Sequence, residues 1–140
     1  MNVIGNISVA EDRLSESLEE DISIEVRDRP VSVTSTIRTI CEVQGCQTEY
    51  LQSVEWRVWS EDRPRSVARV NIVYSDSLIY IKWTRVVVEG EGIATILWDE
   101  ISTQSDKKVF AKPVSDAMKH IADKLGFNTC SFNDSIVSDQ

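Results

Sequence analysis

The stretch ARVNIVYSDSLIYIKWTRVVVEG, residues 68–90, decides the fold class. Apolar and polar side chains alternate along both of its halves, which is the period of a β-strand. Only Asp76 and Ser77 separate the halves, and a two-residue loop joins antiparallel neighbours. The stretch therefore predicts a β-hairpin in which Val70 lies opposite Trp83.

The same reasoning extends the hairpin in both directions. Strands are expected near 22–26, 31–43, 50–60, 66–75, 78–89 and 92–101. The breaks at 61–65 and at Gly90 and Glu91 are too short for a parallel crossover, which needs about a dozen residues or more. We therefore expect a six-stranded antiparallel meander, in which Trp56 lies opposite Val70 and Trp83 lies opposite Trp98.

Amphipathic helices are expected before and after the sheet. A capping box from Ser8 to Glu11, followed by apolar residues at helical spacing, predicts a short helix over 9–20. A second stripe, closed by Gly126 and Phe127, predicts a C-terminal helix: Val114, Met118, Ile121 and Leu125. The prediction is a single α+β domain over residues 1–132 with a flexible tail at 133–140.

The predicted register places most large apolar side chains on one face, which we expect to be the core beneath the C-terminal helix. These residues are Val54, Trp56, Val58, Ala68, Val70, Ile72, Tyr74, Ile79, Ile81, Trp83, Val87, Ala94, Ile96 and Trp98. Arg85 has the same parity. There it must find a partner, line a pocket for an anion, or extend to water at the sheet margin.

The opposite face is predicted to be mixed. It carries Glu55, Arg57, Trp59, Val67, Arg69, Asn71, Val73, Tyr80, Lys82, Thr84, Val86, Thr95 and Asp99. Arg57 opposite Arg69 is unfavourable unless an acid or an anionic ligand lies between them, whereas Lys82 opposite Asp99 is favourable. Because this face is partly apolar, we expect the N-terminal helix or another chain to cover half of it.

Composition excludes several classes of function. The 140 residues carry a formal net charge of −8, which argues against a general binder of nucleic acid or anionic membranes. The single histidine, His120, and the absence of a recognisable catalytic or metal motif predict a protein that is not an enzyme. We expect no cofactor and no metal.

The N-terminus and the cysteines favour a cytoplasmic location. The first residues lack the basic and apolar regions of a signal peptide, and no segment approaches the roughly 20 apolar residues that cross a bilayer. The cysteines, Cys41, Cys46 and Cys130, are odd in number, which favours reduced thiols. A bridge between Cys41 and Cys46 across a turn is the alternative.

Negative charge is concentrated near the N-terminus. Glu16, Glu19, Glu20 and Asp21 form either a solvated helix face or a patch for a basic partner.

Two functions follow from these patterns. The first is a small acidic protein-binding module of the inhibitor, immunity, chaperone or assembly type, with a homodimer as one form. Its binding residues are expected on the mixed face: Arg57, Trp59, Arg69, Tyr80 and Val86. The alternative is a small-ligand-binding half-barrel, whose cavity is lined by Trp56, Trp83 and Trp98 with Arg85 at its mouth.

Overall fold

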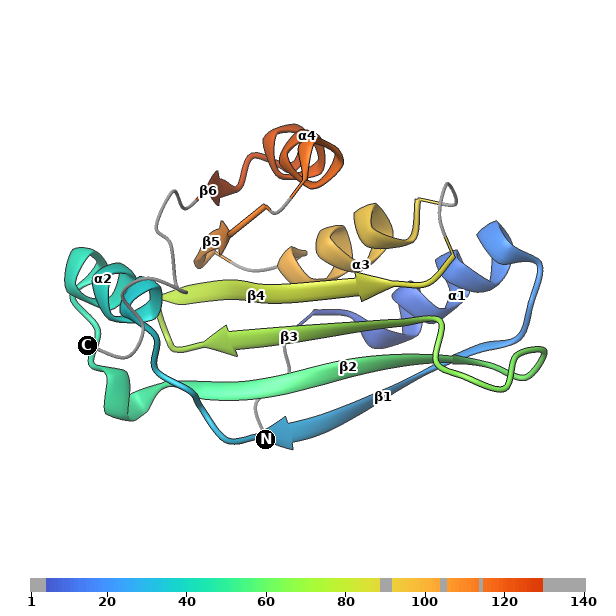
Figure 1. Ribbon diagram of the computed structural model, residues 1–140, viewed down its shortest axis with the longest axis horizontal. Coiled ribbons are helices and arrows are strands. Elements are labelled where there is room, and N and C mark those ends of the chain that lie inside the picture. Colours follow the sequence, from blue (N-terminus) through green and yellow to red (C-terminus); the bar gives the residue numbers. More distant parts are fainter. Residues whose placement is uncertain (1–4, 89–91, 104–105, 114, 130–140) are drawn as a thin grey trace.

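The computed structural model in Figure 1 describes residues 5–88, 92–103, 106–113 and 115–129. The elements in chain order are α1 (Ile7–Leu18), β1 (Ile22–Arg29), α2 (Ser35–Gln44), the 3₁₀ helix η1 (Thr48–Tyr50), β2 (Gln52–Ser60), β3 (Ala68–Tyr74), β4 (Leu78–Val86), α3 (Ile93–Ser102), β5 (Lys108–Ala111), α4 (Asp116–Leu125) and β6 (Asn128–Thr129). The predicted α+β class, with a helix near each end of the chain, is confirmed.

The six strands form one sheet in the order β1-β2-β3-β4-β5-β6. The first four strands are an antiparallel meander, whereas β5 runs parallel to β4 and β6 runs parallel to β5. The prediction that all strands are antiparallel is therefore wrong at this end of the sheet. The chain passes through α3 between β4 and β5, and such a crossover is what parallel neighbours require.

The strand predicted over 31–43 is helix α2. Val33, Ile37 and Cys41 are four residues apart, a spacing that fits one face of a strand and one face of a helix equally well. The capping groups favour the helix over the strand. The Thr34 side chain accepts a hydrogen bond from the Ile37 amide, and Gly45 ends the helix in the left-handed conformation with φ 73°.

The strand predicted over 92–101 is helix α3. Alternation of Ala94, Ile96 and Trp98 suggested a strand, but the buried residues follow a helical spacing: Ile93, Leu97, Trp98 and Ile101. Trp98 therefore has no strand partner, and the expected pairs of Trp98 with Trp83 and of Asp99 with Lys82 do not form.

The central hairpin has the predicted turn. The Ser75 amide donates to the Leu78 carbonyl at 3.0 Å, across Asp76 and Ser77. Trp56 lies opposite Val70, as predicted.

A register shift between Asn71 and Ile72 changes the outer half of this hairpin. Ile72 pairs with Ile81 and Asn71 pairs with Trp83, so Lys82 is an extra residue in β4. Because one inserted residue exchanges the two faces of a strand, Trp83 and Arg85 leave the predicted apolar face and Val86 joins it.

The two faces of the sheet have separate cores. On one face, α1 and α3 cover Trp56 and Val70 in the larger core. On the other, α2 packs over Val73, Leu78 and Tyr80 in a smaller core. Figure 1 shows α2 at the left-hand end of the sheet, and α1 and α3 side by side towards its right-hand end. The large core is therefore covered mainly by α1 and α3 rather than by the C-terminal helix.

The ends of the flanking helices are set by their caps. The N-cap of α1 is Asn6 and not Ser8, since the Asn6 side chain accepts from the Val9 amide at 3.2 Å. At the end of α4, Gly126 is left-handed and the Phe127 amide donates to the Ala122 carbonyl, as predicted. The Phe127 ring then stacks on Trp98, with 5.8 Å between ring centroids.

Some sequence predictions lie outside the described residues: the turn at Gly90 and Glu91, the helix position of Val114, the third cysteine Cys130 and the tail at 133–140. Within the described ranges, no helix combines the length and the apolar character needed to cross a membrane.

Candidate functional site

Part of the second sheet face has no helix packed on it within the described residues. Its charged and aromatic side chains come from the outer parts of β1 to β4, beyond the end covered by α2. We call this surface the open face and define it by Glu25, Arg27, Arg29, Glu55, Arg57, Trp59, Arg69, Trp83 and Arg85.

The open face is positive on a negative protein. Its five arginines and two glutamates give it a formal charge of +3, whereas the whole chain carries −8. A local field of this sign attracts acidic groups even when the net charge of the molecule is negative.

One row of the open face holds three adjacent arginines. Glu25 lies opposite Arg57, Arg57 opposite Arg69, and Arg69 opposite Arg85. Like charges in directly opposed positions repel, so this row needs compensating acids.

Glu55 supplies much of that compensation from the neighbouring row. Its side chain is only 1% exposed. It accepts hydrogen bonds from Arg69 at 2.8 and 3.2 Å and from Arg57 Nε at 2.9 Å. The Arg29 Nε atom lies 3.8 Å from Glu55 Oε1. The hydrogen bonds from Arg69, more than those from Arg57, hold the pKa of Glu55 below its ordinary value. The sequence-based condition that an acid must lie between Arg57 and Arg69 is thus met from within the chain.

A second acid orders the β1 edge of the open face. Glu25 accepts a hydrogen bond from Arg27 Nε at 2.8 Å and another from the Trp59 indole at 3.2 Å. These contacts, led by that of Arg27, lower the pKa of Glu25. Trp59 is therefore fixed by its polar end, and its ring is half-buried.

The β4 edge of the open face differs, because its arginine, Arg85, pairs with no acid among the described residues. Arg69, Trp83, Thr84 and Arg85 line a hollow of about 280 Å³. The Arg69 guanidinium lies 5.6 Å from the centre of the Trp83 ring, a cation–π distance. Trp83 is 39% exposed, and Arg85 is exposed and makes no ion pair within the described part of the chain.

The structure brings together three of the five residues predicted to bind protein. Arg57, Trp59 and Arg69 share the open face. Tyr80 is buried under α2 at 1% exposure, and Val86 packs against the large core on the other side of the sheet. Neither Tyr80 nor Val86 is part of this surface.

Sequence reasoning missed five residues of the open face. Glu25, Arg27 and Arg29 occupy every second position of β1, so pairing that strand with β2 would have placed them here. Trp83 and Arg85 reach this face only through the extra residue Lys82, and nothing in the sequence marks that bulge.

The residues of the predicted ligand cavity are partly dispersed. Trp56 is fully inside the large core at 1% exposure. Trp83 and Trp98 both border a cavity of about 250 Å³ that also includes Ile81 and Met118. The Trp98 indole donates to Thr84 Oγ1 at 2.9 Å, which fixes that wall. Arg85 lines the neighbouring hollow rather than this cavity.

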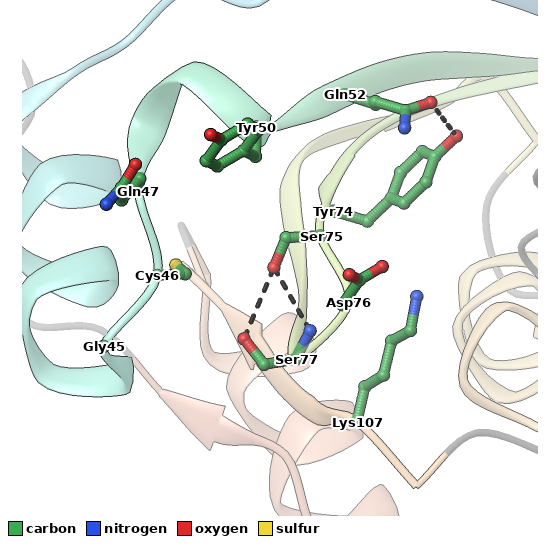
Figure 2. Close-up of a pocket in the computed structure, with 10 residues that line it drawn as sticks. All are labelled: Gly45, Cys46, Gln47, Tyr50, Gln52, Tyr74, Ser75, Asp76, Ser77 and Lys107. Atoms are coloured by element: carbon green, nitrogen blue, oxygen red, sulfur yellow. Dashed lines mark hydrogen bonds between the residues drawn. The ribbon is translucent and has the colours of Figure 1, made fainter.

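A larger cavity, of about 540 Å³, lies where η1 approaches the turn between β3 and β4 (Figure 2). Figure 2 shows its polar lining: the Tyr74 hydroxyl donates to Gln52 at 3.1 Å, and Ser75 bonds to Ser77. The Lys107 ammonium lies 5.5 Å from the centre of the Tyr74 ring. No binding residue predicted from the sequence borders this cavity.

The acidic stretch after α1 is partly neutralised. Glu20 accepts hydrogen bonds from Arg63 at 2.9 and 2.7 Å and from Ser60 at 2.6 Å. The bonds from Arg63, followed by that from Ser60, lower the pKa of Glu20 to about 2. Glu16, Glu19 and Asp21 border a shallow surface with Asp62. The expectation of a basic partner there remains a prediction.

Other chemical possibilities have little support in the described residues. His120 is exposed on α4, far along the chain from the open face. No group of three or more His, Cys, Asp or Glu among the described residues is arranged to hold a metal ion. Comparison of the chain with protein families, curated proteins and solved structures gave no match.

Proposed function

We propose that the chain is a non-enzymatic protein-binding module that uses the open face as its binding surface. The observation that carries the proposal is a positive, arginine- and tryptophan-rich sheet surface on which no helix packs within the described residues.

The composition of the open face supports the proposal. Arginine and tryptophan are enriched among the residues that contribute most to protein–protein affinity. Here they combine half-exposed aromatic rings, Trp59 and Trp83, with guanidinium groups that donate in fixed directions.

Rigidity also supports the proposal. The open face lies on four paired strands, and Glu55 holds Arg57 and Arg69 in place through short hydrogen bonds. A surface that is already ordered loses less conformational entropy on binding.

We include in the proposal a cytoplasmic location, since Cys41 and Cys46 are free thiols.

Site-specific photo-crosslinking tests this function. Trp83 is replaced by p-benzoylphenylalanine in the full chain, and Val43, which is 73% exposed on α2, receives the same group as a control. We expect a discrete protein adduct from position 83 that excess unmodified protein suppresses, and none of the same mass from position 43. No adduct at position 83, or identical adducts from both positions, would overturn the proposal.

A small-ligand site is a second candidate because Trp83 and Trp98 share one cavity with Met118. The test uses anilinonaphthalene sulfonate as the probe, with Trp98→Phe as the variant. Saturable probe fluorescence that the variant weakens supports this candidate, and fluorescence no stronger than with a cavity-free control protein excludes it.

A further inference from the structure

We propose that the hollow formed by Arg69, Trp83 and Arg85 is a carboxylate-binding site that takes an aspartate or glutamate side chain from an acidic segment of the partner protein. This inference rests on the proposed function and specifies the chemistry of the partner.

The chain already binds one of its own carboxylates between two arginines. The Glu55 carboxylate is held by two guanidinium groups from neighbouring strands, Arg57 on one side and Arg69 on the other. Arg69 uses both Nε and Nη2 for this carboxylate, which is the forked geometry that arginine favours.

Arg85 repeats the position of Arg57 on the far side of Arg69. Arg57 and Arg85 both lie directly opposite Arg69, on β2 and β4 respectively. An acid fills the first arginine pair, whereas the second pair encloses a hollow of about 280 Å³ with no acid from the described residues. A carboxylate from outside would relieve the repulsion between Arg69 and Arg85 as Glu55 relieves that between Arg57 and Arg69.

Trp83 completes the site. Its partly exposed ring lies in the same hollow and under the Arg69 guanidinium. The methylene groups of a bound glutamate or aspartate have an apolar surface to contact while the carboxylate meets the arginines.

The charge distribution favours an acidic protein segment over a nucleic acid. Nucleic acids present many closely spaced phosphates, and their binding needs an excess of basic residues over a long surface. This chain has 23 acidic and 15 basic residues, and the open face carries only +3. One or two carboxylates match that charge, whereas a phosphate backbone would meet the surrounding negative charge.

Fluorescence anisotropy of the full chain tests the inference with two defined, labelled probes: a glutamate probe, which is a glycine–serine peptide of 20 residues with two central glutamates, and a thymidine 20-mer of single-stranded DNA. We expect the glutamate probe to bind, with a Kd that Arg85→Glu raises by about tenfold or more, the scale of one lost hydrogen bond to a charged group. The matched variant is Arg38→Glu, an exposed arginine on α2, which should change the Kd by less than about twofold. The Kd of Arg85→Gln for the glutamate probe should lie between those of Arg38→Glu and Arg85→Glu. This variant remains informative if the charge reversal in Arg85→Glu impairs folding.

The outcomes separate this inference from the proposed function. If the glutamate probe fails to bind, binds equally to wild type and Arg85→Glu, or binds more weakly than the DNA probe, the carboxylate site is wrong. In those cases a specific protein adduct at position 83 would still support the protein-binding function, but the partner would be recognised by groups other than carboxylates. If no specific adduct forms at position 83 either, the carboxylate site and the protein-binding function are both wrong.

Discussion

Arg69 and Arg85 lie directly opposite each other on β3 and β4, yet within the described residues only Arg69 is bonded to a carboxylate. Two identical side chains in one row therefore have different roles. Arg69 is held by Glu55 and helps to stabilise the sheet, whereas Arg85 is exposed and has no carboxylate partner among the described residues.

Glu55→Gln should destabilise the protein more than any other single exchange of an acid for its amide on the open face. The variant leaves Arg57 and Arg69 side by side without a charge between them. We expect the free energy of unfolding to fall by about 2–3 kcal/mol in urea denaturation at pH 7.

Glu25→Gln is the matched control, because the Glu25 side chain is 40% exposed and its ion pair with Arg27 is a surface pair. Its effect should stay below about 1 kcal/mol. Equal effects of the two variants would show that Glu55 does not hold the arginine row together.

Stability should fall in acid over a defined range of pH. The pKa values of Glu55 and Glu20 are lowered in the folded protein, that of Glu20 from 4.5 to about 2, chiefly by hydrogen bonds from Arg69 and Arg63 respectively. Because the folded form binds these protons less readily than the unfolded form, the two groups stabilise the fold fully above about pH 4.5.

That stabilisation is lost as the pH drops towards the folded pKa values. Urea denaturation at pH 7, 5, 4 and 3 should show little change between 7 and 5 and a progressive loss below 4.5. Glu55→Gln should make this loss less steep, and an unchanged slope in the variant would argue against the depressed pKa of Glu55.

Gly5 should tolerate no side chain, for two reasons. It has a φ of +79°, and a Cβ atom there would lie 2.6 Å from the Glu100 carbonyl oxygen and 2.8 Å from Ile101 Cα. The left-handed conformation alone costs about 1–2 kcal/mol for alanine, and contact with backbone atoms adds to it.

Gly45→Ala separates the two causes, since Gly45 has a φ of +73° but open space around its Cα. Thermal denaturation should therefore show a larger decrease in Tm for Gly5→Ala than for Gly45→Ala. Similar decreases would contradict the close approach of Gly5 to the backbone of Glu100 and Ile101 in α3.

Cys41 should react slowly with alkylating reagents. Burial, followed by a hydrogen bond with Cys46, raises the pKa of its thiol to about 12. In a Cys130→Ser background, mass spectrometry after brief iodoacetamide treatment at pH 8 should find Cys46 modified first and Cys41 only after unfolding. Rapid modification of Cys41 in the folded protein would contradict its place in the smaller core.

The β2–β3 register and the turn between β3 and β4 could be predicted because strong local signals agree with one another, whereas the expected pair of Val70 with Trp83 is wrong. Asp76 and Ser77 fix a two-residue turn, and Trp56 then reaches Val70 through the parity of both strands. The end of α4 was predictable for the same reason, since Gly126 and Phe127 form a local stop signal.

The rest of the fold depended on tertiary context. The apolar residues of α2 fit both periods, and the choice between them rests on Thr34 and Gly45, whose capping roles the strand interpretation ignored. The bulge at Lys82 has no turn residue or glycine to mark it, yet it decides which face carries Trp83 and Arg85. The candidate site was therefore predicted on its β2–β3 side and missed on its β4 side.

The most direct test of the central claim is to identify which peptide of the captured protein is joined to position 83 in the photo-crosslinking experiment. If the open face binds an acidic segment through Arg85, mass spectrometry should place the cross-link within a few residues of clustered aspartates or glutamates, and Arg85→Glu should abolish the adduct. A cross-link to a basic or wholly apolar segment, formed equally well by Arg85→Glu, would contradict it.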